Sequence, residues 1–245
     1  MQKTFIISFQ KSGTYLISEI LENLGYKKTL IHINKFLGEV HQVYKKQKIS
    51  QGEEVFKRID FKLSADEIIN NLQENYFAVG HVCFSQKSKN ILRDHKIILT
   101  KRNIKTSLIS MMNFMEEKKR MTEDDLNTWH LENDQKEKFY YFLKQYGLGF
   151  IKNCNNLLPW IYEDLLTIKF ENIINPSKSI EELKKISHYL KVNIDNYEKI
   201  LERSFEANTV TKSSKKADLN NYWSQPAEIL FNQIGGNILN KKLGY

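Results

Sequence analysis

The chain has little cysteine and no long apolar run. These two absences argue against a disulfide-rich protein and against a membrane-spanning one. It has two cysteines, Cys83 and Cys154, among 245 residues. Two cysteines do not make a disulfide framework, which favours a reducing compartment. No stretch approaches the ~18 apolar residues that a membrane helix needs. The first residues run straight into a strand-like segment, without a basic-then-apolar leader. We therefore expect a soluble, cytoplasmic protein with no membrane partner.

Sequence motifs for metal and for nucleic acid are also missing. The chain has no H-x-x-x-H or C-x-x-C cluster, and no aromatic RNA-binding signature. Its net charge is +8, but the lysines are spread along the chain rather than collected in one block. We expect no metal and no nucleic-acid partner, and the charge favours a small anionic ligand only weakly.

The length and the hydrophobic pattern favour a single α/β domain over residues 1–245. Neither an internal repeat nor a low-complexity linker divides the chain. Short apolar runs alternate with segments of helical spacing, which predicts a central parallel sheet flanked by helices on both faces. The expected strands are 5–9, 77–80, 96–100 and 165–170. The expected helices are 16–24, one opening at 64, 104–115, 139–158, 179–190, 196–203 and 226–243.

Three segments carry weaker predictions. Residues 31–62 show no clear period. Ser64 followed by Glu67 is a capping-box pattern at a helix start. The charged segment 116–137 contains Trp129 and His130, and it is typical of a surface excursion or a lid over an acceptor.

The most informative segment begins with the apolar run 5–9 and continues through a polar turn into helical spacing. A strand, a loop of backbone N–H groups and a helix N-terminus together make an anion site. The loop residues are Lys11, Ser12, Gly13, Thr14 and Tyr15. They do not match G-x-x-x-x-G-K-[ST], because the first glycine is missing and the order of Lys and Gly is inverted. An ordinary strand–turn–helix with a solvated lysine is the alternative.

A second anion pattern follows the strand 96–100. Arg102 comes just after that strand, and Ser110 lies on the helix expected next. A guanidinium and a hydroxyl that meet there can hold a second phosphate. Taken alone, the pattern is more commonly an arginine at a strand end that pairs with an acidic neighbour.

The two patterns together resemble the cytosolic-type sulfotransferase family, in a compact bacterial form. The family's T-Y-P-K-S-G-T-T-W motif is in register with Ser8-Phe-Gln-Lys11-Ser12-Gly13-Thr14-Tyr15-Leu16, and its R-N-P-K-D-x-x-x-S-x-x-x-F motif is matched by Arg102, Asn103, Lys105, Ser110 and Phe114. The resemblance implies the P-loop-NTPase-like sulfotransferase fold. It also implies a donor, 3′-phosphoadenosine 5′-phosphosulfate, with its 5′-phosphosulfate on the first loop and its 3′-phosphate on Arg102 and Ser110.

The same resemblance covers three further segments. His81 stands close to where the family places its catalytic base, and Lys11 is implied to stabilise the leaving phosphate. The segment 166–176, with Phe170, is similar to the one that borders the adenine. The tail 221–245 is similar to the family's last helix. Lys212 is the residue that corresponds to a family arginine on the 3′-phosphate.

Four positions depart from the family pattern. Gln10 and Ile104 replace prolines, Leu16 replaces the tryptophan that packs on adenine, and the basic loop around Lys212 lacks its glycine. Lysine does not reproduce the bidentate contacts of arginine.

The implied activity is in-line sulfuryl transfer to a hydroxyl or amine of a small-molecule acceptor. A small-molecule or nucleotide kinase, and a catalytically weak nucleotide-binding protein of the same fold, are the alternatives. The oligomeric state is left open. The other histidines are expected to be structural, namely His32, His41, His95, His130 and His188.

Overall fold

The computed structural model describes residues 2–34, 40–48, 54–118, 120–209 and 217–245. Two compact units divide the chain. The first unit is Met1–Lys101 with Pro159–Val210, and the second is Arg102–Leu158 with Thr211–Tyr245. Each unit has its own core and is treated by itself below.

The first unit is built on one sheet of seven strands in the order β4-β3-β2-β5-β1-β6-β7. The strands are β1 (Thr4–Ser8), β2 (Lys27–Asn34), β3 (Val40–Lys48), β4 (Glu54–Lys62), β5 (Tyr76–His81), β6 (Lys96–Lys101) and β7 (Leu166–Lys169). Strands β2, β5, β1, β6 and β7 run parallel to one another, whereas β3 pairs antiparallel with both β2 and β4. The predicted α/β class with a parallel central sheet is therefore confirmed.

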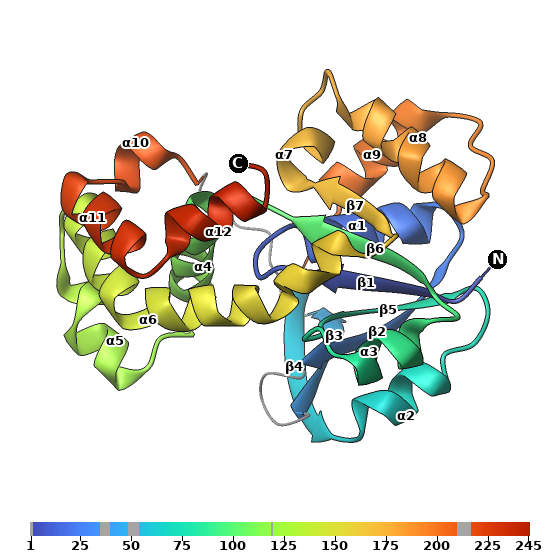
Figure 1. Ribbon diagram of the computed structural model, residues 1–245, viewed down its shortest axis with the longest axis horizontal. Coiled ribbons are helices and arrows are strands. Elements are labelled where there is room, and N and C mark those ends of the chain that lie inside the picture. Colours follow the sequence, from blue (N-terminus) through green and yellow to red (C-terminus); the bar gives the residue numbers. More distant parts are fainter. Residues whose placement is uncertain (1, 35–39, 49–53, 119, 210–216) are drawn as a thin grey trace. The chain divides into compact units, whose positions relative to one another are not determined.

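Helices cover both faces of this sheet (Figure 1). They are α1 (Thr14–Asn23), α2 (Ala65–Asn70), α3 (Gln86–Leu92), α7 (Phe170–Ile173), α8 (Ser179–Leu190) and α9 (Tyr197–Glu206). The short helix η3 (Leu158–Tyr162) precedes β7. Apolar side chains of α1, α8 and α9 form one buried cluster with alternate residues of β1, β5, β6 and β7, such as Ile6, Val79 and Ile98. Burial on both faces explains why the strands read as continuous apolar runs.

The second unit is helical. Its helices are α4 (Ile104–Glu117), α5 (Glu123–Asn127), η2 (Trp129–Leu131), α6 (Gln135–Leu157), α10 (Leu219–Tyr222), α11 (Gln225–Gln233) and α12 (Gly236–Lys242). The long α6 packs against α4, α10, α11 and α12. The Asn240 side chain accepts a hydrogen bond of 2.8 Å from the Ile104 amide, which ties α12 to the start of α4. Among the described residues of both units, no helix is long and apolar enough to cross a membrane.

The expectation that 116–137 is a surface excursion is wrong for Trp129. Its side chain is fully buried, and its indole N–H donates to the Asp125 carboxylate at 2.7 Å. The Tyr146 hydroxyl donates to the same carboxylate at 2.6 Å. Several donors stabilise the buried charge of Asp125. The burial of Trp129 and Asp125 was not predicted, because most of their neighbours in the sequence are charged or polar.

Two local predictions at helix ends were also wrong. Ser64 is the N-cap of α2, but its side chain makes no capping hydrogen bond, so the capping box is not formed there. The single helix predicted over 226–243 is two helices. It breaks at Gly235, whose φ of 86° lies in the left-handed region that ends a helix and turns the chain.

Gly80 of β5 is required by the close approach of β2. A Cβ on Gly80 would lie 2.3 Å from the Ile33 carbonyl oxygen and 2.9 Å from the Ile33 Cβ. The backbone oxygen cannot move without disturbing the ladder between the two strands. Strand β5 therefore carries a glycine immediately before His81.

We predict that Gly80→Ala lowers the free energy of unfolding by about 1–3 kcal/mol, because it overpacks a fixed backbone. Gly149→Ala is the matched control. A Cβ at Gly149 meets nothing within 4 Å, and alanine in a helix interior is expected to stabilise by about 0.5–1 kcal/mol. Urea denaturation measures both. Equal effects of the two substitutions would contradict the close approach at Gly80.

Candidate functional site

The loop that joins β1 to α1 is closed onto β6 by one buried hydroxyl. The Ser12 Oγ lies 2.6 Å from the Phe9 carbonyl oxygen, 3.0 Å from the Thr100 carbonyl oxygen and 2.8 Å from the Thr100 hydroxyl. The Phe9 amide also donates to the Thr100 carbonyl at 3.0 Å. With Ser12 only 1% exposed, these contacts fix the loop from inside the protein.

The backbone of this loop turns twice through the left-handed region. φ is 59° at Lys11 and 91° at Gly13. This conformation costs a residue with a side chain about 1–2 kcal/mol, so the surroundings must hold Lys11 in it. Gly13 is the N-cap of α1, and no side chain caps the helix there. The first-turn amides and the positive end of the helix dipole suit a bound anion.

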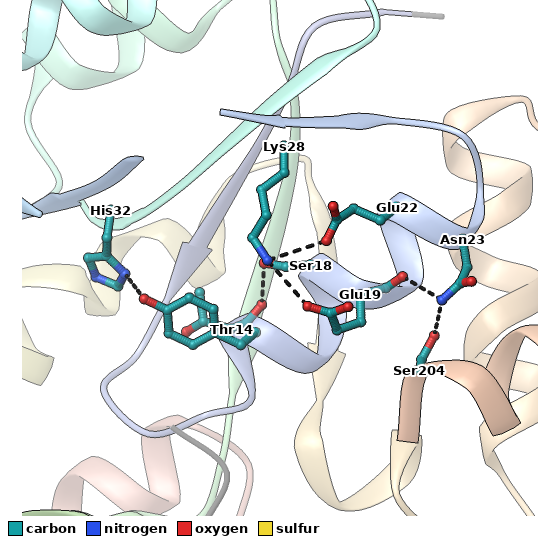
Figure 2. Close-up of polar contacts among 9 residues, drawn as sticks. Thr14, Ser18, Glu19, Glu22, Asn23, Lys28, His32 and Ser204 are labelled. Carbon is teal, nitrogen blue, oxygen red and sulfur yellow. Dashed lines mark hydrogen bonds and ion pairs between the residues drawn. The ribbon is translucent and has the colours of Figure 1, made fainter. Parts of the chain in front are cut away.

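Helix α1 is held firmly behind this loop. Figure 2 shows Lys28 of β2 between Glu19 and Glu22, with Nζ–O distances of 3.2 and 3.3 Å. At the last residue of the same helix, the Asn23 side chain donates to the Ser204 hydroxyl of α9 at 3.1 Å. Contacts with β2 and with α9 therefore hold the C-terminal half of α1.

Thr14 and Tyr15 begin the helix with buried side chains. The Tyr15 hydroxyl lies 3.1 Å from His32 Nδ1, so it is directed to β2. Its predicted contribution to an anion site therefore comes from the backbone.

Phe170 lies against the same loop. Its ring is so close to Gly13 that a Cβ there would be 2.5 Å from Phe170 Cδ2. Leu16, at the position of the family tryptophan, packs with Phe170 against the hydrophobic cluster under α1. The structure thus brings Phe170 next to the loop, and uses Leu16 for packing.

His81 ends β5, and its ring is anchored on the end of β1. Its Nδ1 lies 2.7 Å from the Ser8 carbonyl oxygen and 3.3 Å from the Ser8 hydroxyl oxygen. A carbonyl oxygen only accepts, so we assign the proton to Nδ1. The basic lone pair of the neutral ring is then on Nε2.

Burial lowers the pKa of His81 below its usual value of 6.5, the Ser8 hydrogen bond opposes that change, and the positive charge of Lys11 lowers the pKa further. A lowered pKa keeps the imidazole neutral at pH 7. The ring therefore has the protonation state that a general base needs.

Arg102 and Ser110 belong to the second unit. Arg102 follows β6 directly, is half-buried, and donates from Nε to the Thr106 hydroxyl at 3.1 Å. Asn103 caps α4 by accepting from the Lys105 amide at 2.9 Å. Ser110 lies half-buried on the same helix.

The first unit thus brings together the predicted loop, His81 and Phe170. Lys212 and the rest of 211–216 lie outside the described residues. Sequence reasoning missed Ser8, Thr100 and His32, which contact the predicted residues. Strand register could have suggested Ser8 and Thr100, which are opposite each other on β1 and β6. No three His, Cys, Asp or Glu residues in the described part of the chain are grouped to hold a metal ion.

Comparison with known proteins agrees with this fold. A family model described as the sulfotransferase domain matches residues 1–235. No curated protein matches the chain in sequence. The structure is similar to that of mouse sulfotransferase SULT7A1 complexed with PAP, with a TM-score of 0.60 and 17% identity, over 98% of this chain and 89% of that one.

A second similar structure is retinol dehydratase in complex with androsterone and the inactive cofactor PAP. Its TM-score is 0.55 with 12% identity, over 95% of this chain and 80% of that one. At these identities the two structures show a shared fold. The family model spans nearly the whole chain, and on that ground the chain belongs to the sulfotransferase domain family.

Proposed function

We propose that this protein transfers a sulfuryl group from 3′-phosphoadenosine 5′-phosphosulfate to a hydroxyl or amine of a small-molecule acceptor. The main support for this proposal is the arrangement of residues at the end of β1. Ser8 anchors His81 there as a neutral base, and the strand leads directly into a loop with the backbone of an anion site. Membership of the sulfotransferase family supports the reaction type.

The donor-binding residues follow from the predicted motifs. We assign the 5′-phosphosulfate to Lys11 and to the amides of Gly13, Thr14 and Tyr15, with Ser12 holding that loop in place. Phe170 borders the adenine in this proposal, and Arg102 with Ser110 and Lys212 binds the 3′-phosphate. The two similar structures were both solved with PAP, the desulfated form of this donor.

The donor supplies an activated sulfuryl group. The acceptor oxygen or nitrogen forms a bond to sulfur as the bond from sulfur to the 5′-phosphate oxygen breaks. His81 Nε2 takes the acceptor proton, and its Nδ1–H bond to Ser8 stabilises the imidazolium that forms. Lys11 stabilises the negative charge that develops on the departing phosphate oxygen. Transfers of this kind depend mainly on positioning and charge stabilisation.

Donor binding can be measured by calorimetry with 3′-phosphoadenosine 5′-phosphate. We predict binding that does not depend on magnesium and is tighter than binding of ATP with magnesium. Arg102→Ala should weaken it about 10–100-fold, because hydrogen bonds between charged groups contribute about 1.5–3 kcal/mol. Arg93→Ala is the matched control, since Arg93 is exposed and its guanidinium lies 3.7 Å from the exposed Asp94 carboxylate. A preference for ATP with magnesium would favour a kinase and contradict the proposal.

The role of His81 has a separate test. We predict that His81→Ala lowers kcat about 10²–10⁴-fold, the range for loss of a general base. Binding of 3′-phosphoadenosine 5′-phosphate should be kept. His188→Ala, at an exposed position on α8, should leave turnover unchanged. A His81→Ala enzyme with normal turnover would remove His81 from the mechanism.

The pH dependence follows from the direction of the His81 pKa. The base works only when neutral, and its folded pKa is lowered below 6.5. We therefore predict that kcat/KM is level from pH 7.5 down to about 6.5 and falls only at more acidic pH. A rate that already halves between pH 7.5 and 6.5, as a base with the ordinary pKa of about 6.5 would give, would contradict the assignment.

A further inference from the structure

His32 is a buried histidine beside the proposed base. It lies on β2, is 7% exposed, and its Nδ1 is 3.1 Å from the Tyr15 hydroxyl. The dashed line from His32 in Figure 2 marks this bond to the first turn of α1. The His32 ring also packs edge-on against His81, with centroids 4.8 Å apart and planes at 63°. The pattern of the sequence had left His32 as a structural residue.

In the first unit, His32 contacts both the helix that follows the proposed anion loop and the proposed base. Tyr15 is in the first turn of α1, directly after the anion loop. The Ser8 carbonyl oxygen accepts from His81 Nδ1, and the His32 ring packs against the His81 ring. A phenol is a good donor and an imidazole nitrogen a good acceptor, so we assign the Tyr15 proton to the bond with His32 Nδ1.

The charged and titratable groups around these rings favour a neutral His32. Burial places its pKa well below 6.5, and His81 and His41 lower that pKa further. Lys11 acts on His81 in the same direction. Lys28 lies 5.8 Å from the centre of the Tyr15 ring. His32 thus excludes water from one side of His81 without adding a charge that would oppose its protonation.

We propose that His32, held by Tyr15, is a positioning residue that keeps His81 desolvated and aimed by its Nδ1–H at Ser8. This role rests on the proposed function in one respect, that His81 is the base. It adds a physical connection between the proposed donor loop and the proposed base. The connection runs from Tyr15 in the first turn of α1 to His32 on β2, and from His32 to His81.

Three variants separate the parts of this link. His32→Ala removes the ring that covers His81. His32→Phe keeps a ring but loses the hydrogen bond to Tyr15. Tyr15→Phe removes only the hydroxyl. The matched controls in the same unit are His95→Ala, at another half-buried histidine with a pKa lowered by burial, and Tyr189→Phe, whose hydroxyl accepts from the Ile97 amide at 3.2 Å.

Nitrogen-15 NMR of the imidazoles gives a readout that needs no turnover. We predict that His81 in the wild-type protein is the Nδ1–H tautomer. In His32→Ala, water beside His81 should raise its pKa by about half a unit or more toward 6.5. In His32→Phe and in the two controls, the pKa of His81 should not rise. If His32→Ala leaves the pKa and the tautomer of His81 unchanged, the proposal is overturned.

Steady-state kinetics test the hydrogen bond between Tyr15 and His32. With saturating donor, kcat should fall about tenfold in His32→Ala and about threefold in Tyr15→Phe and His32→Phe, as expected for a loosened catalytic group. The affinity of His32→Phe for 3′-phosphoadenosine 5′-phosphate should stay within about twofold. If His32→Ala does not fold, His32→Phe decides, since wild-type kcat in that variant would overturn the proposed role of the Tyr15–His32 hydrogen bond. A wild-type protein without sulfotransferase activity would instead refute the proposed function, while the NMR result still decides how His32 acts on His81.

Discussion

The Ser12 hydroxyl joins the loop after β1 to Thr100 at the end of β6, and the rest of the proposed donor loop depends on this contact. It lets Lys11 keep a left-handed backbone angle that a residue with a side chain seldom adopts in an isolated peptide, whereas Gly13 reaches its positive φ without strain. Those angles direct the chain into the uncapped N-terminus of α1. The buried contacts of Ser12 with Phe9 and Thr100 thus fix the loop backbone without a ligand, and a site ordered in advance lowers the ordering cost of the binding that we propose.

The same strand end sets the state of the proposed base. The Ser8 carbonyl oxygen accepts a hydrogen bond from His81 Nδ1, and the residues after Ser8 form the proposed anion loop. Gly80 lets β2 approach closely enough for His32 to touch the His81 ring. Burial and the nearby Lys11 both favour a neutral imidazole. Fold and chemistry are thus linked in the first unit, because the closeness of the strands produces the desolvation that the base needs.

The sequence predicted those features that depend on local pattern. The run 5–9, the helix after it and the helix at 179–190 have periods that are visible in the chain itself. It did not predict β3 and β4, or that Trp129 is buried on Asp125. It also did not predict that His32 contacts His81. These features depend on partners far apart in the sequence, and no local period encodes them. The motif residues Lys11 and His81 were identifiable, but the bond that orients His81 was not.

We propose that the amides after β1 hold the phosphate end of the donor, and titration of the nitrogen-15-labelled protein with 3′-phosphoadenosine 5′-phosphate shows which amides the ligand reaches. We expect the largest amide shifts at Lys11, Gly13, Thr14 and Tyr15, and we expect magnesium to leave these shifts unchanged. Saturable binding that leaves these four amides unshifted would mean that the phosphate is held elsewhere.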